Sequence, residues 1–401
     1  MTNPTLTRLP RPRDVLREFG LYVHVPFCSH RCGYCDFNAY AGIDHAIEEY
    51  MTALVTDARY ARSAPVDADV TDRPEVTSIF VGGGTPSLVP AASIGAVLDA
   101  IRGSWPVSRD AEITIECNPE STEDDKLAAY LEAGVTRISF GVQSLDNELL
   151  LSLGRTHDAE TALDALDRAG RAGFENVSAD LIFGIPGEDD ERWLESLEGV
   201  LERGTSHVSA YALIYEEGTP LESWRKLGKV VPVDDDTVAR RWELGNAVFA
   251  EAGFERYEFS NWCRPGRNSV HNSLYWKCGE YLGIGAGAHS HLATEGGARR
   301  SWAQRGPERY ARTVLDGSSA MAGSEEIQRR MRASEVMLLG LRRTEGIKAD
   351  TFEGLVGVSL QDTYPAELAR GVDRGLLTWD GECVRLARPL LGNEAALLFV
   401  D

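Results

Sequence analysis

Residues 21–40, LYVHVPFCSHRCGYCDFNAY, join a short apolar run to three closely spaced cysteines. The run 21–25 predicts a β-strand. Cys28, Cys32 and Cys35 follow it at the spacing CxxxCxxC, and Phe37 stands two residues after the last of them. Thiolates grouped at such a spacing are typical metal ligands. The stretch therefore predicts a metal centre on the loop that leaves the first strand.

The pattern of a short apolar strand followed by an amphipathic helix recurs along the chain. Strands are predicted at 21–25, 77–81, 112–116, 136–140, 177–182 and 207–213. Helices are predicted at about 45–62, 91–102, 123–133, 159–172, 189–202 and 235–252. Six such units in series predict a parallel α/β sheet, which is either a curved partial barrel or an open doubly wound sheet.

Polar and glycine residues fall where these strands end. Residues 82–85, GGGT, follow the second strand, and Glu116 ends the third. Gln143 follows the fourth strand, and Asp180 lies in the fifth. Parallel strands present their carboxyl ends on one rim, so we expect these groups to converge there with the cysteine loop.

Composition limits the classes of partner and compartment. The net charge of −21 argues against a nucleic-acid partner, which would require a basic face. No stretch is long and apolar enough to cross a membrane, so we do not expect an integral membrane protein. Residues 1–20 lack a signal-peptide pattern, and seven cysteines in a long chain do not resemble a disulfide framework. These features favour a reducing cytoplasm.

The chain of 401 residues predicts one large and one smaller domain. The predicted divisions are an N-terminal tail at 1–20, the barrel at 21–263, a connecting segment at 264–317 and a C-terminal domain at 318–401.

The C-terminal domain is predicted to be helical and winged-helix-like. Helical patterns cover 325–342 and about 361–374, and 376–387 reads as a hairpin. A winged helix can bind nucleic acid, but acidic residues outnumber basic ones here. A packing or lid domain is the favoured interpretation.

Three thiols on one loop are compatible with several kinds of site. A structural zinc site needs four ligands, and His24 or His30 would have to complete it. A disulfide is the weaker alternative in a reducing compartment. A [4Fe–4S] cluster held by only three thiolates keeps one iron open for an outside ligand, which is where chemistry occurs.

The motif CxxxCxxC, with Tyr34 just before the last cysteine, resembles the signature of the radical S-adenosylmethionine (SAM) family. That resemblance implies a partial (βα)₆ barrel and a [4Fe–4S] cluster on Cys28, Cys32 and Cys35. It also implies SAM bound to the open iron and an electron donor for the cluster. In that family, the reduced cluster cleaves SAM to a 5′-deoxyadenosyl radical.

A longer series of motifs narrows the resemblance. YVHVPFCSHRCGYCDF, GGGTPSL, ECNPES, ISFGVQS, GRTH and DLIFGIPGE are similar to the branch that holds oxygen-independent coproporphyrinogen III oxidase and the HemW heme chaperones. The oxidase binds two SAM molecules. The resemblance implies SAM contacts at Tyr22, Tyr34, Gly83, Gly84, Thr85, Glu116, Gln143, Arg155 and Asp180.

Three features separate the two groups of this branch. The oxidase motif has a further cysteine where this chain has Phe37, and the oxidase has a longer N-terminal segment. Residues 271–276, HNSLYW, resemble the HNxxYW signature of the HemW group. That resemblance implies a chaperone that binds heme and transfers it to apoproteins. The alternative is oxidative decarboxylation of coproporphyrinogen III.

The hexapeptide suggests how heme would be held. The His271 imidazole could be an axial ligand, with Tyr275 and Trp276 packed on the porphyrin. Cys263 and Cys278 are weaker candidates for ligands. The alternative for His271 is a hydrogen-bonded histidine in an aromatic core.

Overall fold

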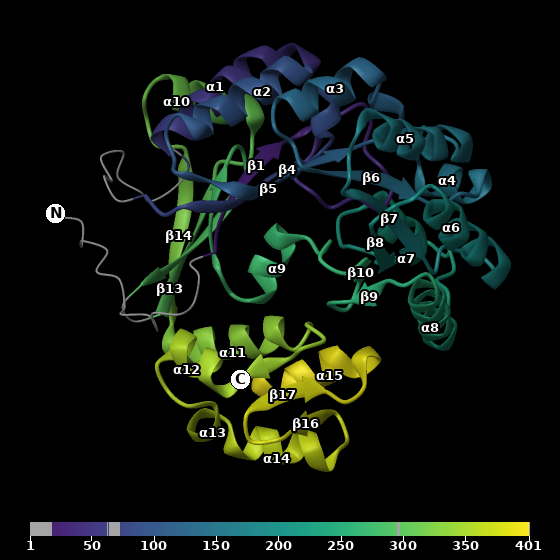
Figure 1. Ribbon diagram of the computed structural model, residues 1–401, viewed down its shortest axis with the longest axis vertical. Helices are drawn as coiled ribbons and strands as arrows, with labels where there is room; N and C mark the ends of the chain where they lie inside the picture. The colour runs from purple at the N-terminus through teal and green to yellow at the C-terminus, as the bar shows by residue number, and fades with distance from the viewer. Residues whose placement is uncertain (1–17, 62, 64–72, 295–296, 401) are drawn as a thin grey trace.

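The six predicted parallel strands all form, and each lies beside the next one along the chain (Figure 1). The computed structural model describes residues 18–61, 63, 73–294 and 297–400, so most of the predicted tail lies outside it. A doubly wound sheet reverses its strand order at a switch point, whereas the order of these six strands never reverses. The chain therefore forms the partial (βα)₆ barrel, with a sheet that is not closed. The parallel strands are β1 (Phe19–Val25), β4 (Val76–Gly83), β5 (Val107–Cys117), β6 (Arg137–Gln143), β7 (Val177–Phe183) and β8 (His207–Ala212).

The predicted helices form the layer outside this sheet (Figure 1). Three of them begin at an aspartate that accepts a hydrogen bond from a backbone N–H in the first turn: Asp158, Asp189 and Asp234. Two short helices, α4 (Asn147–Leu153) and α7 (Pro220–Lys226), were not predicted. The predicted helices are α1 (Ile47–Tyr60), α2 (Ala91–Arg102), α3 (Asp124–Glu132), α5 (Ala159–Ala172), α6 (Asp190–Glu202) and α8 (Asp235–Glu251).

The main core fills the space between the strands and these helices. Ile115 and Ile138 of adjacent strands are fully buried there, as are Leu98 and Leu197 of the helices. Burying one such side chain contributes about 1.5–3 kcal/mol, so the core fixes the rim on which the strand ends meet.

The sheet continues beyond the barrel on both sides. β11 (Glu280–Ile284) pairs in parallel with the outer edge of β1. Three antiparallel strands follow it: β12 (His289–Thr294), β13 (Gly297–Ala303) and β14 (Met321–Gln328). Short strands β10 (Asn261–Cys263) and β9 (Glu255–Arg256) extend the opposite edge beyond β8. Much of the predicted connecting segment 264–317 therefore belongs to the sheet.

The prediction of a helix at 325–342 is wrong over residues 325–328, which would form its first turn. Glu325 and Glu326 lie in β14, and only α11 (Arg329–Gly340) is helical. Arg299 and Arg300 of β13 form cross-strand ion pairs with these glutamates at 2.5 and 2.8 Å. Such pairs stabilise the strand, although the local sequence alone favours a helix.

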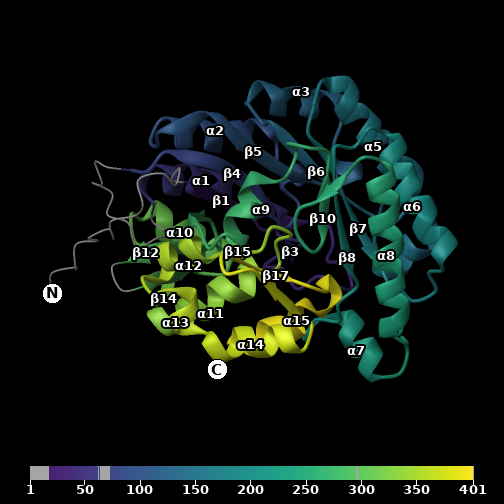
Figure 2. The ribbon, with the colours of Figure 1, turned by 60° about the horizontal axis from the view of Figure 1, so that its bottom comes forward.

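The C-terminal residues form a unit with a core of its own (Figure 2). Its hairpin is β16 (Leu377–Trp379) and β17 (Cys383–Leu386), as predicted, and β15 (Ile347–Lys348) adds a third strand. The helix predicted at 361–374 is instead α13 (Leu360–Thr363) and α14 (Pro365–Asp373), because proline lacks the N–H that a continuous helix needs. The unit also contains α12 (Ala349–Val356) and α15 (Gly392–Ala396).

Buried hydrogen bonds attach this unit to the sheet. Arg332 of α11 donates to the Cys278 carbonyl and contacts His291 Nε2, both at 2.7 Å. Cys278 itself packs within the C-terminal core. In the part of the chain that the structure describes, no helix has the length and apolar character to cross a membrane.

Candidate cofactor and ligand site

The strand ends meet as predicted. Gly83 at the end of β4 pairs with Val25 at the end of β1, where the cysteine loop begins. Glu116 of β5 pairs with Ser139 of β6, and the Ser139 hydroxyl donates to Asp180 of β7 at 3.2 Å. The polar residues of four neighbouring strands thus form one continuous rim.

The cysteine loop is held against this rim with its three thiols free. Arg155 Nη1 donates to Cys32 Sγ, and Thr85 Oγ1 donates to Cys28 Sγ, each at 3.5 Å. Gly33 in the loop bonds through its backbone to α4 and α7. Burial raises the pKa of the Cys28 thiol, and a neighbouring cation or metal is needed to make thiolate the favoured form. The loop therefore offers three prepositioned sulfur ligands.

Of the two histidines that would complete a zinc site, His24 is fully engaged elsewhere. His24 uses both ring nitrogens, on the Tyr22 hydroxyl at 2.9 Å and the Asn38 carbonyl at 3.0 Å. His30 Nε2 bonds to the Gly154 carbonyl and lies 3.9 Å from Cys32 Sγ, and its buried Nδ1 has no partner. Over the described ranges, no group of three or more Cys, His, Asp or Glu side chains could hold a single metal ion. In a four-iron cluster each thiolate binds a different iron, so such close convergence is not required.

Glycines bring the end of β4 against the cysteine loop. A Cβ on Gly84 would lie 2.7 Å from the Phe27 carbonyl oxygen and 3.1 Å from Cys28 Sγ. Gly83 has a φ of +119°, and its N–H donates to Glu116 Oε2 at 3.0 Å. A backbone without side chains can approach a ligand closely, so this turn fits a small molecule beside the loop.

Glu116 is the most strongly perturbed acid of the rim. Burial raises the pKa of its carboxyl to about 7, and repulsion from Asp180 adds to this rise. The Gly83 N–H and the Arg137 guanidinium act in the opposite direction. A carboxyl that titrates near neutrality inside a cavity is typical of a functional group.

A second set of predicted residues lies on the neighbouring loops. Arg155 Nη2 donates to the Asn118 side chain and the Gly141 carbonyl, each at 2.9 Å. Its Nε is buried without a partner. Tyr34 packs near Arg155, and Gln143 has a φ of +69° at a bulge in β6. The orphaned Arg155 nitrogen fits a ligand with acceptor atoms between these loops.

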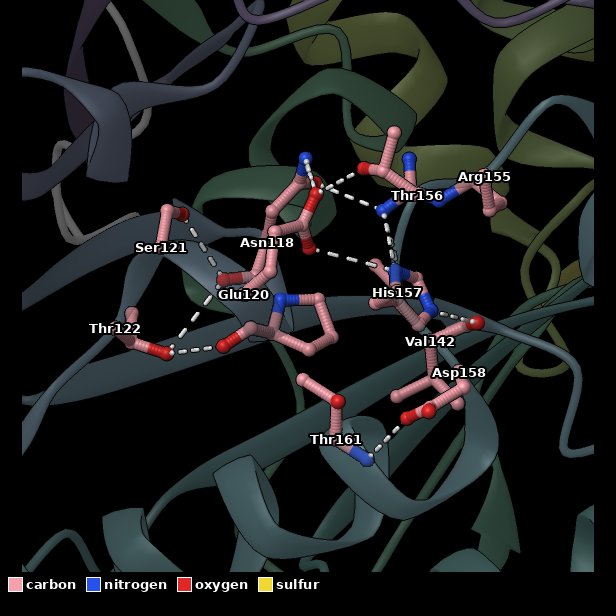
Figure 3. Close-up of polar contacts among 12 residues, drawn as sticks. Asn118, Glu120, Ser121, Thr122, Val142, Arg155, Thr156, His157, Asp158 and Thr161 are labelled. Atoms are coloured by element: carbon pink, nitrogen blue, oxygen red, sulfur yellow. Dashed lines mark hydrogen bonds and ion pairs between the residues drawn. The ribbon is translucent and has the colours of Figure 1, made fainter.

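Figure 3 shows how the loops after β5 and α4 are joined. Glu120 accepts a hydrogen bond from Thr156 Oγ1 at 2.7 Å and lies 3.4 Å from His157 Nδ1. Burial opposes ionisation of Glu120, but hydrogen bonds from His157 and Thr156 prevail and lower its pKa to about 2. His157 Nε2 contacts the Val142 carbonyl at 3.0 Å. The network fixes the position of Arg155, which lies between Thr156 and α4.

A cavity of about 470 Å³ opens on this rim, within the size range of small-molecule sites. It brings three predicted SAM residues together with Phe37 and Tyr275, whereas Gln143, Arg155 and Asp180 do not line it. The lining residues are Tyr22, His24, Phe37, Asn38, Gly83, Glu116, Tyr275, Tyr281, Gly287, His289, Trp302, Ala303 and Arg305.

His271 is a hydrogen-bonded histidine in an aromatic core, which is the alternative to heme ligation that the sequence left open. It lies in α9 (Val270–Trp276) and is fully buried. Its ring nitrogens contact Ser78 Oγ at 2.9 Å and the Tyr275 hydroxyl at 2.8 Å, and burial lowers its pKa to about 3. Phe80 stacks on its ring. Axial ligation by His271 remains a prediction, and in this conformation both ring nitrogens are engaged.

Sequence reasoning missed the cavity wall that β12 and β13 supply. His289, Trp302 and Arg305 line it, and all three come from the predicted connecting segment 264–317, in which only the residues of the HNxxYW motif and Cys278 were singled out. The glycine-rich run before His289, GIGAGA, was the available signal, because glycines after a strand often mark a close backbone approach.

Comparisons with known proteins agree with this geometry. The radical SAM superfamily model matches residues 22–200, and the HemN C-terminal domain model matches 327–389. The structure of coproporphyrinogen III oxidase (HemN) from Escherichia coli superposes with a TM-score of 0.80 at 21% identity, covering 96% of this chain and 90% of that one. This likeness shows the shared fold.

Sequence relatives are closer. The heme chaperone HemW of Mycobacterium tuberculosis is 38% identical over 388 residues, covering 94% of this chain and 95% of that protein. HemW of Bacillus subtilis is 33% identical over 377 residues, covering 93% of this chain and 97% of that protein. The mouse mitochondrial radical S-adenosyl methionine domain-containing protein 1 is 37% identical, covering 94% of this chain and 85% of that protein. The chain therefore belongs to the HemW family of the radical SAM superfamily, whose members are implied to use SAM and a [4Fe–4S] cluster.

Proposed function

We propose that this protein is a heme chaperone, which binds heme and transfers it to heme-accepting apoproteins. The observation that carries the proposal is 38% identity to a heme chaperone HemW across nearly the full length of both chains. The aromatic cavity beside the cysteine loop supports it, because a porphyrin needs an apolar, planar site. Seven free cysteines support a reducing cytoplasm as its location.

We propose that Cys28, Cys32 and Cys35 hold the [4Fe–4S] cluster and that an electron donor reduces it. When bound, the cluster supplies a low-potential electron and an open iron position for SAM. The chain's own contribution is positional: the Thr85 hydroxyl and the Arg155 guanidinium each donate to a cluster sulfur ligand. Such hydrogen bonds stabilise thiolate and tune the potential of a cluster.

We propose that SAM lies on Tyr22, Gly83, Gly84, Thr85 and Glu116. The glycine turn provides a backbone surface without side chains, and the Glu116 carboxylate can accept from the SAM amino group or a ribose hydroxyl. We assign Tyr34, Gln143, Arg155 and Asp180 to the adjoining contacts. The unpartnered Nε of Arg155 supports that assignment.

The affinity for SAM should fall as the pH drops from about 8 to about 6. Protonation of Glu116, whose pKa is about 7, removes a negative charge that attracts the cationic ligand. The other charged or titratable groups around it are Asp180, Arg137, Tyr22, Tyr275 and Cys117. The affinity can decline by up to about tenfold per pH unit. Calorimetric titration of the reconstituted protein with SAM at several pH values measures this dependence.

The Glu116→Gln variant should lose this pH dependence, because an amide does not titrate. Glu120→Gln is the matched control. The pKa of Glu120 is about 2, so that carboxylate stays ionised over the whole range and its removal leaves the slope intact. An unchanged slope in Glu116→Gln would contradict the assignment of Glu116.

Two assays on one anaerobically reconstituted sample test the proposed function. Hemin titration should shift the Soret band and saturate near one heme per chain. Coproporphyrinogen III incubated with SAM and a reductant should not be converted catalytically, because this chain has Phe37 where the oxidase motif has a further cysteine. Absence of a Soret shift would refute the chaperone function, and catalytic turnover would establish the oxidase activity instead.

A further inference from the structure

We propose that the heme iron is bound by His289 and that Arg305 faces the heme propionates, in the part of the cavity that β12 and β13 line. This assignment rests on the proposed heme function and specifies its site. It is drawn from three properties of the wall: one available imidazole, one available guanidinium and an aromatic surface between them.

His289 is the available imidazole of the cavity. It is exposed to solvent at the start of β12 and lines the cavity directly. Among the described residues, neither of its ring nitrogens has a hydrogen-bond partner, and its ring contact is with Trp302. By contrast, His24 and His271 each use both ring nitrogens within the protein. An imidazole with a free nitrogen lone pair can bind iron without breaking any bond of the fold.

The remaining candidates are less accessible. His291 contacts Arg332 through Nε2 at 2.7 Å and is buried. Cys263 and Cys278 are also buried, and burial raises the pKa of each thiol to about 11. A neutral buried thiol is a poor iron ligand. The choice among these residues therefore favours His289.

Arg305 is the available cation at the same wall. Its Nε donates to Asn38 Oδ1 at 3.3 Å, and within the described ranges no carboxylate forms an ion pair with its guanidinium. Arg299 and Arg300 of the adjacent strand are both paired with glutamates. A guanidinium without a carboxylate partner, in a protein of net charge −21, is suited to an external carboxylate such as a propionate.

Aromatic side chains supply the surface that a porphyrin requires. Trp302 stacks with His289 at a ring-centroid distance of 6.0 Å, and Tyr275 meets Tyr281 edge-on at 4.6 Å. Phe37 lines the same cavity with 62% of its surface exposed. An apolar side chain this exposed gains free energy when a planar apolar ligand covers it.

The wall is fixed to the cysteine loop. Asn38 Nδ2 donates to the Ala286 and Arg305 carbonyls, each at 3.0 Å. Gly287 has a φ of +75°, and a Cβ there would lie 2.5 Å from Asn38 Nδ2. Since Asn38 follows the cysteine loop directly, the heme site and the cluster loop share one support.

Hemin titration of the full-length protein and its single variants tests the assignment. His289→Ala should lose the Soret shift that imidazole ligation produces and bind hemin at least about tenfold more weakly. Added imidazole should restore the shift in His289→Gly, because the free base can occupy an exposed site. Arg305→Gln should weaken binding by about tenfold while leaving the Soret position unchanged, since a charge-assisted hydrogen bond is lost without a change of iron ligand.

His45→Ala is the matched control, because His45 is an exposed histidine outside the cavity that pairs with Glu308. It should bind hemin like the wild type. A wild-type Soret shift that persists unchanged in His289→Ala would overturn the assignment and leave the chaperone function standing. A wild type without any shift would overturn both.

Discussion

Replacing Cys32 with alanine should abolish the proposed iron–sulfur cluster. The reconstituted wild type should carry about four irons per chain and absorb broadly in the visible region, whereas the variant should retain almost none of this iron. The reason is that the loop provides only three thiols, and the nearby His24 Nε2 and His30 Nε2 are already bonded to backbone carbonyls. Iron analysis and absorbance spectra of both proteins, prepared side by side, measure the difference.

Cys263→Ala is the matched control for this loss. Cys263 is also a free, buried cysteine, but it lies in β10 on the far edge of the sheet. This variant should take up iron like the wild type. Full iron loading in Cys32→Ala, or stoichiometric zinc in the wild type with no uptake of iron, would refute the cluster.

Replacing Gly84 with alanine should abolish SAM binding and destabilise the cluster loop. The new Cβ would lie 2.7 Å from the Phe27 carbonyl oxygen and 2.9 Å from the Pro26 carbonyl carbon, so the backbone itself must move. Overpacking of this kind costs about 1–3 kcal/mol of unfolding free energy. We expect the affinity for SAM to fall by at least about tenfold, and the melting temperature to drop with it. Calorimetry and thermal unfolding measure the two effects.

Gly170→Ala is the matched control. It shows whether the effects of Gly84→Ala come from the close contacts at that turn or from replacing any glycine with alanine. Gly170 lies inside α5, and a Cβ there meets no atom within 4 Å. Its replacement should leave SAM binding intact and stabilise the protein by about 0.5–1 kcal/mol, because alanine favours helix. Wild-type affinity for SAM in Gly84→Ala would show that this turn does not contact the ligand.

The parallel barrel was predictable because its strands are buried on both faces. Runs such as 177–182 are apolar over their length, and the capped helices between them have a clear period. The antiparallel extension was not predictable in this way. In β14 polar residues such as Glu325 and Glu326 face solvent, and the strand exists because β13 provides arginines opposite them. Local sequence does not record a partner that lies elsewhere in the chain.

The same distinction holds for the site. Gly83 and Glu116 were found because each lies at the end of a recognisable strand. His289 and Arg305 were missed because they line a cavity with Asn38, which lies about 250 residues earlier in the chain. His271 was found by its motif, but its environment was not: only the packed structure shows Ser78 and Tyr275 at its two ring nitrogens.

The position of β1 in the middle of the sheet sets an order of assembly during translation. The cysteine loop leaves the ribosome early, but β1 gains its second neighbour only when β11 (Glu280–Ile284) has been made. At about 5–20 residues per second, this interval lasts roughly 10–50 s. Throughout it, three nascent thiols are attached to a strand with one open edge. We therefore expect the proposed cluster to assemble most productively late in synthesis, once the strand that closes this edge has emerged.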